Sequence, residues 1–170
     1  MTDKTLNVLF LCRSNSTLSI FGEAILNRLG RRRFHAFSAG SDPAPEIDAE
    51  TLVQLERNNY AHLGLHVNDW RDYAQPDAPV MDFVIVLSAD VPGSKQPDWP
   101  GNPMITHWHI EDPANAQGEG LQYRAAFVKA LKELESRISI FVNLPLESLD
   151  RFKLQQRLNA IGKQDNRPGP

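Results

Sequence analysis

The sequence has little cysteine and no long hydrophobic run. Cys12 is the single cysteine, which excludes a framework of intrachain disulfides and a cysteine-rich zinc site. The first apolar run, "LNVLFL" at residues 6–11, is too short for the core of a signal peptide and far too short to span a bilayer. These absences predict a cytoplasmic chain that starts near Met1, folds by packing alone and has no membrane partner.

Charge of one sign is also scarce. The formal net charge is -3 over 170 residues, and the longest basic run, Arg31–Arg33, is followed directly by an apolar stretch. Such a run suits the solvated C-terminal end of a helix, where cations complement the helix dipole. We therefore expect no nucleic-acid partner. With 41% hydrophobic residues, a chain of this length can bury one core but is short for two, which indicates a single domain.

Four stretches predict β-strands. Residues 6–11 form the continuous apolar run that is typical of a strand buried on both faces of a parallel sheet. "FHAFSAG" (34–40), "MDFVIVLSA" (81–89) and "MITHWHI" (104–110) follow, and the first of these ends in a glycine turn.

Helical patterns separate these strands. From Thr17 apolar residues recur at helical spacing up to Gly30, and "EIDAETLVQLERNNYAHLG" (46–64) predicts a second helix. "GLQYRAAFVKALKELESRISIFVNL" (120–144) is a long amphipathic helix with one apolar stripe: Phe127, Leu131, Leu134, Ile138 and Phe141. The alternation predicts an α/β fold, a single domain with a four-stranded, mainly parallel sheet and helices on both faces.

The chain beyond Pro145 has a separate pattern. "LESLDRFKLQQRLNAIGK" (146–163) repeats the helical period and predicts a short docked appendage. "QDNRPGP" (164–170) has nothing to bury, so we expect disorder there. The predicted division is a domain at 1–145, a helical extension at 146–162 and a disordered tail at 163–170.

The turn "CRSNSTLS" (12–19) joins the first strand to the first helix, the place where open parallel sheets bind ligands. Backbone N–H groups and the helix N-terminus there favour an oxyanion and a Cys12 thiolate, and such a setting lowers a cysteine pKa from about 8.5. The plain alternative is a buried cysteine at a strand end, because free cysteine is among the most buried residue types.

The stretch "VLFLCRSNSTLS" resembles the low-molecular-weight tyrosine phosphatases and, more closely, the arsenate reductases of the same fold, whose loop reads C-x5-R-S with Asn at the fourth position. "FSAGSDPA" is similar to the family's second strand and turn, "MDFVIVLSADVPG" to its third strand, and "WPGNPMITHWHIEDPA" to the stretch with its general-acid aspartate. "LPLESLDRFKLQQRLNAIG" is similar to the C-terminal extension of some bacterial members. The resemblance covers nearly the whole chain and implies a phosphatase-like fold.

The resemblance also implies a site. Cys12 stands at the position of the nucleophile, Asn15 at that of the residue that shapes the loop, and Ser19 at that of the hydroxyl that assists the thiolate. Asp112, before Pro113, stands where the family has the acid that protonates the leaving oxygen. The oxyanion would lie on the loop residues Arg13, Ser14, Asn15, Ser16, Thr17 and Leu18.

Leu18 stands where the family has its arginine. A guanidinium fork holds two oxygens of the transferring group, and losing one preorganised oxyanion donor costs about 100- to 1,000-fold in rate. Ser88 and Gln96 stand where arsenate reductases of this type carry further thiols, which excludes a reductase that relies on its own thiols. "HVNDW" (66–70) replaces the family's basic stretch ahead of the third strand.

These departures leave three functions open. The leading hypothesis is an arsenate reductase-like or phosphatase-like protein with impaired or absent catalysis that acts as a binding or regulatory protein. Its ligand would be a small oxyanion (phosphate, arsenate or sulfate), a phosphotyrosine-like group or a protein partner. The alternative is an active phosphatase, or an arsenate reductase supplied with external glutathione or mycothiol, in which Arg13 replaces the fork and Asp112 transfers the proton. A redox sensor is the third, and it requires an exposed Cys12 with a lowered pKa.

Several residues carry an ordinary structural interpretation beside the functional one. Asn15 and Ser19 are common loop and helix caps, and an Asp-Pro step such as Asp112–Pro113 is a common turn starter. His107 and His109 share a strand face, but the pattern supplies no third ligand, so we expect no metal and no cofactor. Four aromatic residues either rim a cleft or fill the core: Trp70, Tyr73, Trp99 and Trp108.

Overall fold

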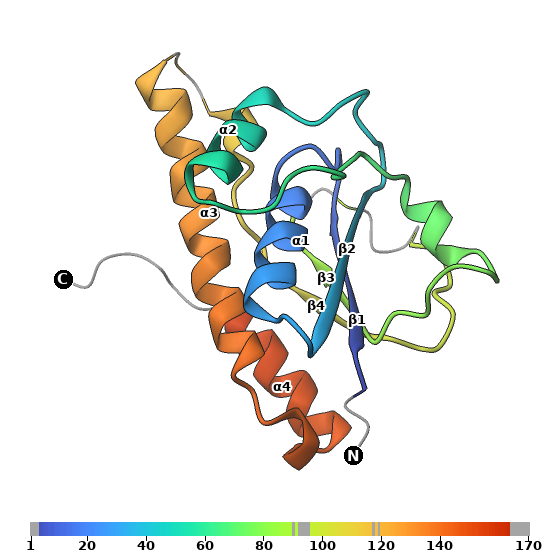
Figure 1. Ribbon diagram of the computed structural model, residues 1–170. Coiled ribbons are helices and arrows are strands. Elements are labelled where there is room, and N and C mark those ends of the chain that lie inside the picture. The colour runs from blue at the N-terminus through green and yellow to red at the C-terminus, as the bar shows by residue number, and fades with distance from the viewer. Residues whose placement is uncertain (1–3, 90, 92–95, 117, 119, 164–170) are drawn as a thin grey trace.

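A four-stranded parallel sheet forms the centre of the molecule. The computed structural model describes residues 4–89, 91, 96–116, 118 and 120–163. The strands lie in the order β2-β1-β3-β4, and all three pairings are parallel (Figure 1). Their bounds are β1 Leu6–Cys12, β2 Phe34–Gly40, β3 Phe83–Val86 and β4 Met104–His107. The predicted α/β fold with a four-stranded, mainly parallel sheet is confirmed.

Two hydrophobic cores lie on opposite faces of this sheet, because successive residues of a strand point to opposite sides. Val8 and Phe10 belong to the larger core, whereas Leu9 and Leu11 belong to the smaller one. All four side chains are fully buried. Burial on both faces explains why the first strand is a continuous apolar run.

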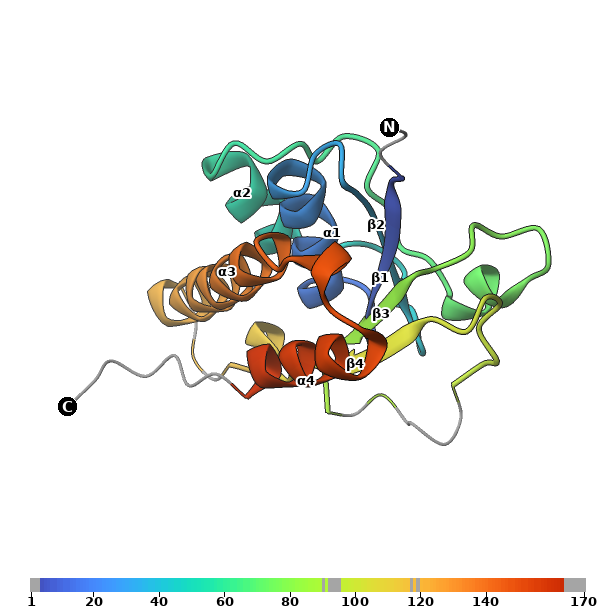
Figure 2. The ribbon, with the colours of Figure 1, turned by 90° about the horizontal axis from the view of Figure 1, so that it is seen from below.

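The described residues form four α-helices: α1 Leu18–Leu29, α2 Ala49–Arg57, α3 Leu121–Val142 and α4 Arg151–Gly162. They gather on one side of the sheet (Figures 1 and 2). The other face carries the short 3-10 helix η1 (Trp70–Ala74) and loops, so the α-helices cover one face and a 3-10 helix lies on the other. Trp70 and Trp99 pack edge to face in the smaller core, with ring centroids 6.3 Å apart.

The two C-terminal helices close the larger core. The predicted apolar stripe of α3 is buried along its length, from Phe127 to Phe141. On α4 the buried residues are Leu154, Leu158 and Ile161, and the Trp108 Nε1–H donates to the Leu158 carbonyl over 3.0 Å. The predicted tail lies outside the described residues from 164 onward. Within the described chain no helix is both long and apolar enough to cross a membrane.

Three predicted element boundaries are wrong. The second helix covers Ala49–Arg57 rather than 46–64. The Asp48 side chain caps its first turn by accepting from Glu50 N over 2.9 Å, and Asn59, at φ 61°, turns the chain away after its end. The third and fourth strands stop at Val86 and His107, although single hydrogen bonds still join Trp108 N to the Val86 carbonyl and Ile110 N to the Leu87 carbonyl.

Candidate active site

The turn 12–19 lies at the carboxyl end of β1, one of the two central strands. Cys12 is the last residue of β1, and α1 begins at Leu18 with Thr17 at its N-cap. The loop 13–17 therefore lies over the N-terminus of α1, where the helix dipole adds about half a positive charge. This is the position at which open parallel sheets bind ligands.

The Cys12 thiol lies in a network of three hydrogen bonds. Its Sγ is 2.9 Å from Ser19 Oγ and accepts from Asn15 N over 3.3 Å. Asn15 Nδ2 donates to Ser19 Oγ over 2.7 Å. Because Ser19 Oγ accepts from Asn15, its own hydrogen is available to the sulfur. The arrangement can stabilise negative charge on Sγ.

Burial nevertheless raises the pKa of the Cys12 thiol above its ordinary value, because desolvation outweighs the hydrogen bonds from Ser19 and Asn15, which lower it. The negative charge of Asp112 raises the pKa further. The expectation of a lowered cysteine pKa is therefore wrong: the side chain is only 4% exposed, and desolvation outweighs the hydrogen bonds that favour the thiolate. The redox-sensor hypothesis required exposure and a lowered pKa, and Cys12 has neither.

We expect the Cys12 pKa to respond to its two polar neighbours in opposite directions. Ser19→Ala removes a hydrogen bond that lowers the pKa, so the thiolate should form at higher pH than in wild type. Asp112→Asn removes a charge that raises the pKa, so the thiolate should form at lower pH. Because Cys12 is the single cysteine, the rate of thiol alkylation against pH reports the thiolate of this residue alone. A shift in the same direction for both variants would contradict this electrostatic account.

Asn15 adopts a left-handed backbone conformation, with φ of 52°, and is fully buried. Its Oδ1 accepts from Asn68 N over 2.7 Å, while its Nδ2 reaches Ser19. Asn is among the few residues other than glycine that adopt this conformation readily. The side chain thus joins the loop to the segment before η1 and to the start of α1.

The rest of the loop is held from two sides. On the α2 side, Ser16 O accepts from Thr51 Oγ1 over 2.9 Å, and Thr51 Oγ1 also lies 3.0 Å from Thr17 Oγ1. On the β2 side, Arg13 O accepts from Asp42 N over 2.8 Å and Ser14 O from Ala44 N over 2.9 Å. Ser14 Oγ and Ser16 Oγ are 2.8 Å apart. These contacts give the loop a fixed backbone.

Gly40, the last residue of β2, allows this close approach. A Cβ there would lie 2.5 Å from the Arg13 carbonyl oxygen and 2.9 Å from Asn15 N, both backbone atoms. Only glycine brings the loop backbone so near to β2 without a clash.

Leu18 is 1% exposed and packs in the larger core, which also contains Cys12. The loop therefore ends in an apolar side chain. Arg13, the cation in the loop, has an exposed side chain whose Nη2 lies 3.5 Å from Asp42 Oδ2. The guanidinium is thus engaged with a carboxylate at the surface.

Asp112 lies close enough to the loop for its charge to act on Cys12. Its side chain also accepts from Ala114 N over 2.9 Å and caps the 3-10 helix Pro113–Asn115. The turn-starting interpretation of Asp112 is therefore confirmed, and its role as a general acid stays a prediction.

Three residues that the sequence pattern did not single out hold the site: Thr51, Asn68 and Asp48. Asp48 N donates to Ser16 O over 3.2 Å, and Asp48 Oδ2 accepts from the Tyr123 hydroxyl over 3.1 Å. All of these contacts join residues 30 or more positions apart, and no local pattern reveals such pairs.

Ser88 and Gln96, the positions of further thiols in the resemblance, lie in different surroundings. The Ser88 hydroxyl is buried two residues beyond β3 and has no hydrogen-bond partner among the described residues. Gln96 Oε1 accepts from Trp99 Nε1 over 3.2 Å. The His107 and His109 rings lie 5.9 Å apart and perpendicular, and the described part of the chain has no cluster of three or more His, Cys, Asp or Glu that could hold a metal.

Comparisons with known proteins agree with this fold. Residues 7–154 match the family described as low molecular weight phosphotyrosine protein phosphatase. An arsenate reductase of Bacillus licheniformis is 29% identical over 143 residues, which cover 83% of this chain and 96% of that protein. The arsenate reductase of Archaeoglobus fulgidus superposes with a TM-score of 0.62 at 25% identity, over 81% of this chain and 99% of that one.

A longer relative shares the fold. The thioredoxin-dependent arsenate reductase Cg_ArsC1' of Corynebacterium glutamicum superposes with a TM-score of 0.59 at 21% identity. The match covers 92% of this chain but 64% of that protein, so this chain spans about two thirds of its length. Because the family match extends over most of the sequence and includes the loop, the chain belongs to the low molecular weight phosphotyrosine protein phosphatase family.

Proposed function

We propose that this chain is an arsenate reductase-like member of the phosphatase family with impaired or absent catalysis, and that it acts as a binding or regulatory protein. The observation that carries the proposal is Leu18, a buried apolar side chain at the end of the loop. A transferring phosphoryl or arsenate group needs a cation there to hold its equatorial oxygens.

The protonation state of Cys12 supports the same proposal. The thiolate is the nucleophile, and a raised cysteine pKa lowers the fraction of thiolate at neutral pH. Burial raises the pKa of the Cys12 thiol. The raised thiol pKa therefore slows attack on phosphorus or arsenic, independently of the missing cation at position 18.

Carboxylates around the loop add a third argument. The Asp42 carboxylate lies 3.5 Å from the guanidinium of Arg13 and offsets the charge of this loop cation, and the negative charge of Asp112 acts on Cys12. Negative charge near the loop disfavours binding of a dianion. We propose that the loop binds phosphate, arsenate or sulfate weakly through its backbone amides, or receives a phosphotyrosine-like group of a partner.

The second candidate function is an active enzyme, and the preserved network of Cys12, Ser19 and Asn15 favours it. In this candidate Cys12 attacks in line, Asp112 gives and later takes the proton, and Arg13 leaves Asp42 to close over the anion. Reduction of arsenate would then draw its electrons from an external thiol such as glutathione.

Turnover by wild type beside Cys12→Ser separates the two candidates. We expect both proteins to hydrolyse a generic aryl phosphate at the same background rate, because neither has the cation that stabilises the transition state. The same comparison with arsenate and glutathione should show no difference. Turnover in wild type that disappears in Cys12→Ser and that Leu18→Arg does not raise would overturn the proposal, and Arg13→Ala would then test the substitute cation.

A further inference from the structure

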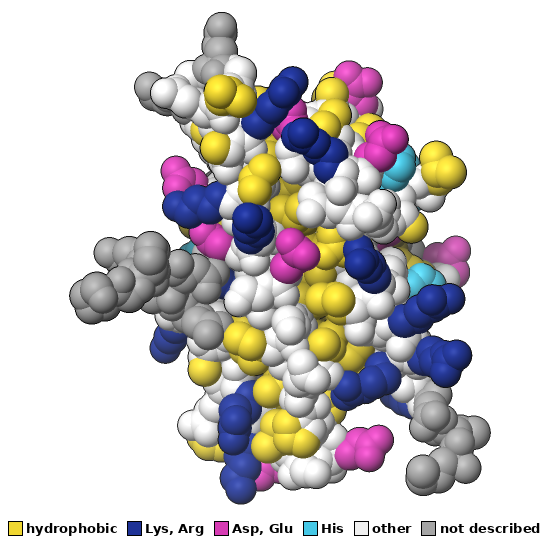
Figure 3. Space-filling view, turned by 60° about the vertical axis from the view of Figure 1, so that its left-hand side comes forward, with side chains coloured by type: hydrophobic (Ala, Val, Ile, Leu, Met, Phe, Trp, Pro, Cys, Tyr) yellow, Lys and Arg dark blue, Asp and Glu magenta, His cyan; other side chains and the backbone are white. Residues whose placement is uncertain are grey.

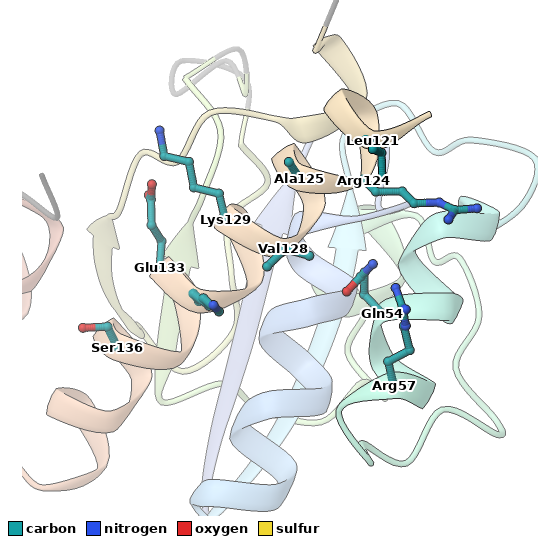
Figure 4. A pocket seen from close by; sticks show the side chains of 10 residues that line it. Gln54, Arg57, Leu121, Arg124, Ala125, Val128, Lys129, Glu133 and Ser136 are labelled. Carbon is teal, nitrogen blue, oxygen red and sulfur yellow. The ribbon is translucent and has the colours of Figure 1, made fainter. Parts of the chain in front are cut away.

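A groove between α2 and α3 lies apart from the candidate active site. It encloses about 780 Å³ and is lined by Gln54 and Arg57 of α2 together with one face of α3 (Figure 4). Neither the residues 12–19 nor Asp112 lines it, although Lys129 and Glu133 also line the small pocket at Asp112. The groove is therefore a separate surface, and any inference about it goes beyond the proposed function of the loop.

The α3 side of the groove is a regular helical stripe. Its lining residues run from Leu121 to Ser136 at alternating steps of three and one, which is the spacing of residues on one helix face. The stripe is about 22 Å long at 1.5 Å per residue. The core-facing residues of α3, such as Phe127 and Leu134, lie at other positions. The helix is thus buried along one face and open to solvent along another.

This open face has an apolar floor. Leu121 is 82% exposed, and Ala125 and Val128 continue the apolar line between the two helices. Figure 4 shows Arg124, Gln54 and Arg57 toward α2, and Lys129 and Glu133 on the opposite side of Val128. In the space-filling view of Figure 3, hydrophobic side chains form a band along this side of the molecule, with Lys and Arg along both edges.

The rim of the groove is basic, although the whole chain carries a net charge of -3. Four lining residues are cations and one is an anion: Arg57, Arg124, Lys129, Lys132 and Glu133. Glu50 offsets part of this charge, since its Oε1 lies 3.5 Å from Arg124 Nε. Arg57, Lys129 and Lys132 outnumber Glu133 along the rim, and this excess gives the groove a positive potential.

We propose that this groove docks an acidic amphipathic helix of a partner protein. The straight stripe between two helices has the form that receives a third helix, with ridges packed into the groove. The apolar floor is complementary to an apolar stripe on the partner helix, and the basic rim is complementary to Asp and Glu residues beside that stripe. The docking surface is independent of turnover at Cys12.

The test is a selection from a displayed library of helical peptides about 18 residues long, enough to cover the stripe at 1.5 Å per residue. We expect the wild-type protein to enrich peptides with apolar residues at i, i+3, i+4 and i+7 flanked by Asp or Glu. A fluorescein-labelled copy of the most enriched peptide then reports affinity by anisotropy. Absence of enrichment, or enrichment of basic or neutral helices, would overturn the proposal.

Matched variants localise the binding. The double variant Lys129→Glu, Lys132→Glu should lower the affinity for the labelled peptide at least about tenfold, because like charges then face each other. Leu121→Ser should lower this affinity as well. All three side chains are exposed, so the fold should persist. Lys153→Glu on α4 and Leu63→Ser, where the side chain is 93% exposed, are controls outside the groove and should bind like wild type. Equal losses in controls and groove variants would contradict the site.

Two other occupants are outcomes of the same experiment. Vesicles of phosphatidylglycerol in phosphatidylcholine are the probe for a lipid surface. Binding to wild type but not to the Lys129→Glu, Lys132→Glu variant would identify a lipid surface and overturn the proposal of a helical protein partner. Sedimentation velocity showing a wild-type dimer that the same variant dissociates would identify a second copy of this chain and overturn it too. Neither readout depends on turnover, so failure here is distinguishable from failure of the proposed function.

Discussion

Leu18→Arg is expected to raise kcat/KM for aryl phosphate hydrolysis about 100- to 1,000-fold above wild type, since it restores one preorganised oxyanion donor. The rest of the loop is already held in place: Ser19 and Asn15 contact the sulfur, and Thr51 fixes the loop from α2. The measurement is initial rate against substrate concentration for both proteins.

Three controls accompany this substitution. Leu18→Met changes shape without charge and should leave the rate unchanged, while Leu18→Lys supplies a point charge without the fork and should give a smaller gain. Cys12→Ser in the Leu18→Arg background should abolish the gain. Survival of the gain without Cys12 would show that the thiol is not the nucleophile.

The introduced arginine has a stability cost that itself reports on the site. Leu18 is 1% exposed, so an unpaired guanidinium there should destabilise the fold. Inorganic phosphate should raise the Tm of Leu18→Arg and leave that of wild type nearly unchanged, because a ligand stabilises the state that binds it. A folded Leu18→Arg protein that binds phosphate without gaining turnover would contradict the idea that the arginine is the missing part.

The sheet was predictable because its signals are local. Residues 8–11 are apolar throughout, which requires cover on both faces, and the two cores provide it. The second helix was overextended because its apolar spacing continues past Arg57, whereas Asn59 turns the chain with a positive φ. Such turns depend on backbone conformation and not on hydrophobic period.

The site was predictable in position but not in electrostatics. The resemblance located the Cys12 loop, yet the helix N-terminus alone suggested a lowered pKa, and burial reverses the sign. Cys12 is buried in the larger core, most of whose members come from elements distant in the sequence. The supports from Thr51 and Asn68 were missed for the same reason, because the chain brings them to the loop only in three dimensions.

Asn15→Ala is expected to destabilise the protein by about 3 kcal/mol. Alanine at φ 52° costs about 1–2 kcal/mol. Removal of the side chain also leaves Asn68 N without its acceptor and Ser19 Oγ without its donor, and a buried unpaired donor costs about 1–3 kcal/mol. Urea unfolding of wild type and variant measures the difference as a shift in midpoint at constant slope.

Two further variants separate the backbone contribution from the hydrogen bonds. Asn59→Ala places alanine at a similar φ of 61° on an exposed turn, so it should lose only the backbone share, about 1 kcal/mol. Asn15→Gly tolerates the left-handed conformation but removes the side-chain bonds, so it should lose the hydrogen-bond share. The contradicting outcome is a loss of unfolding free energy that is no larger for Asn15→Ala than for Asn59→Ala. In that case the hydrogen bonds to Asn68 and Ser19 do not hold the loop, and the contacts from α2 and from the β2 side fix its backbone instead.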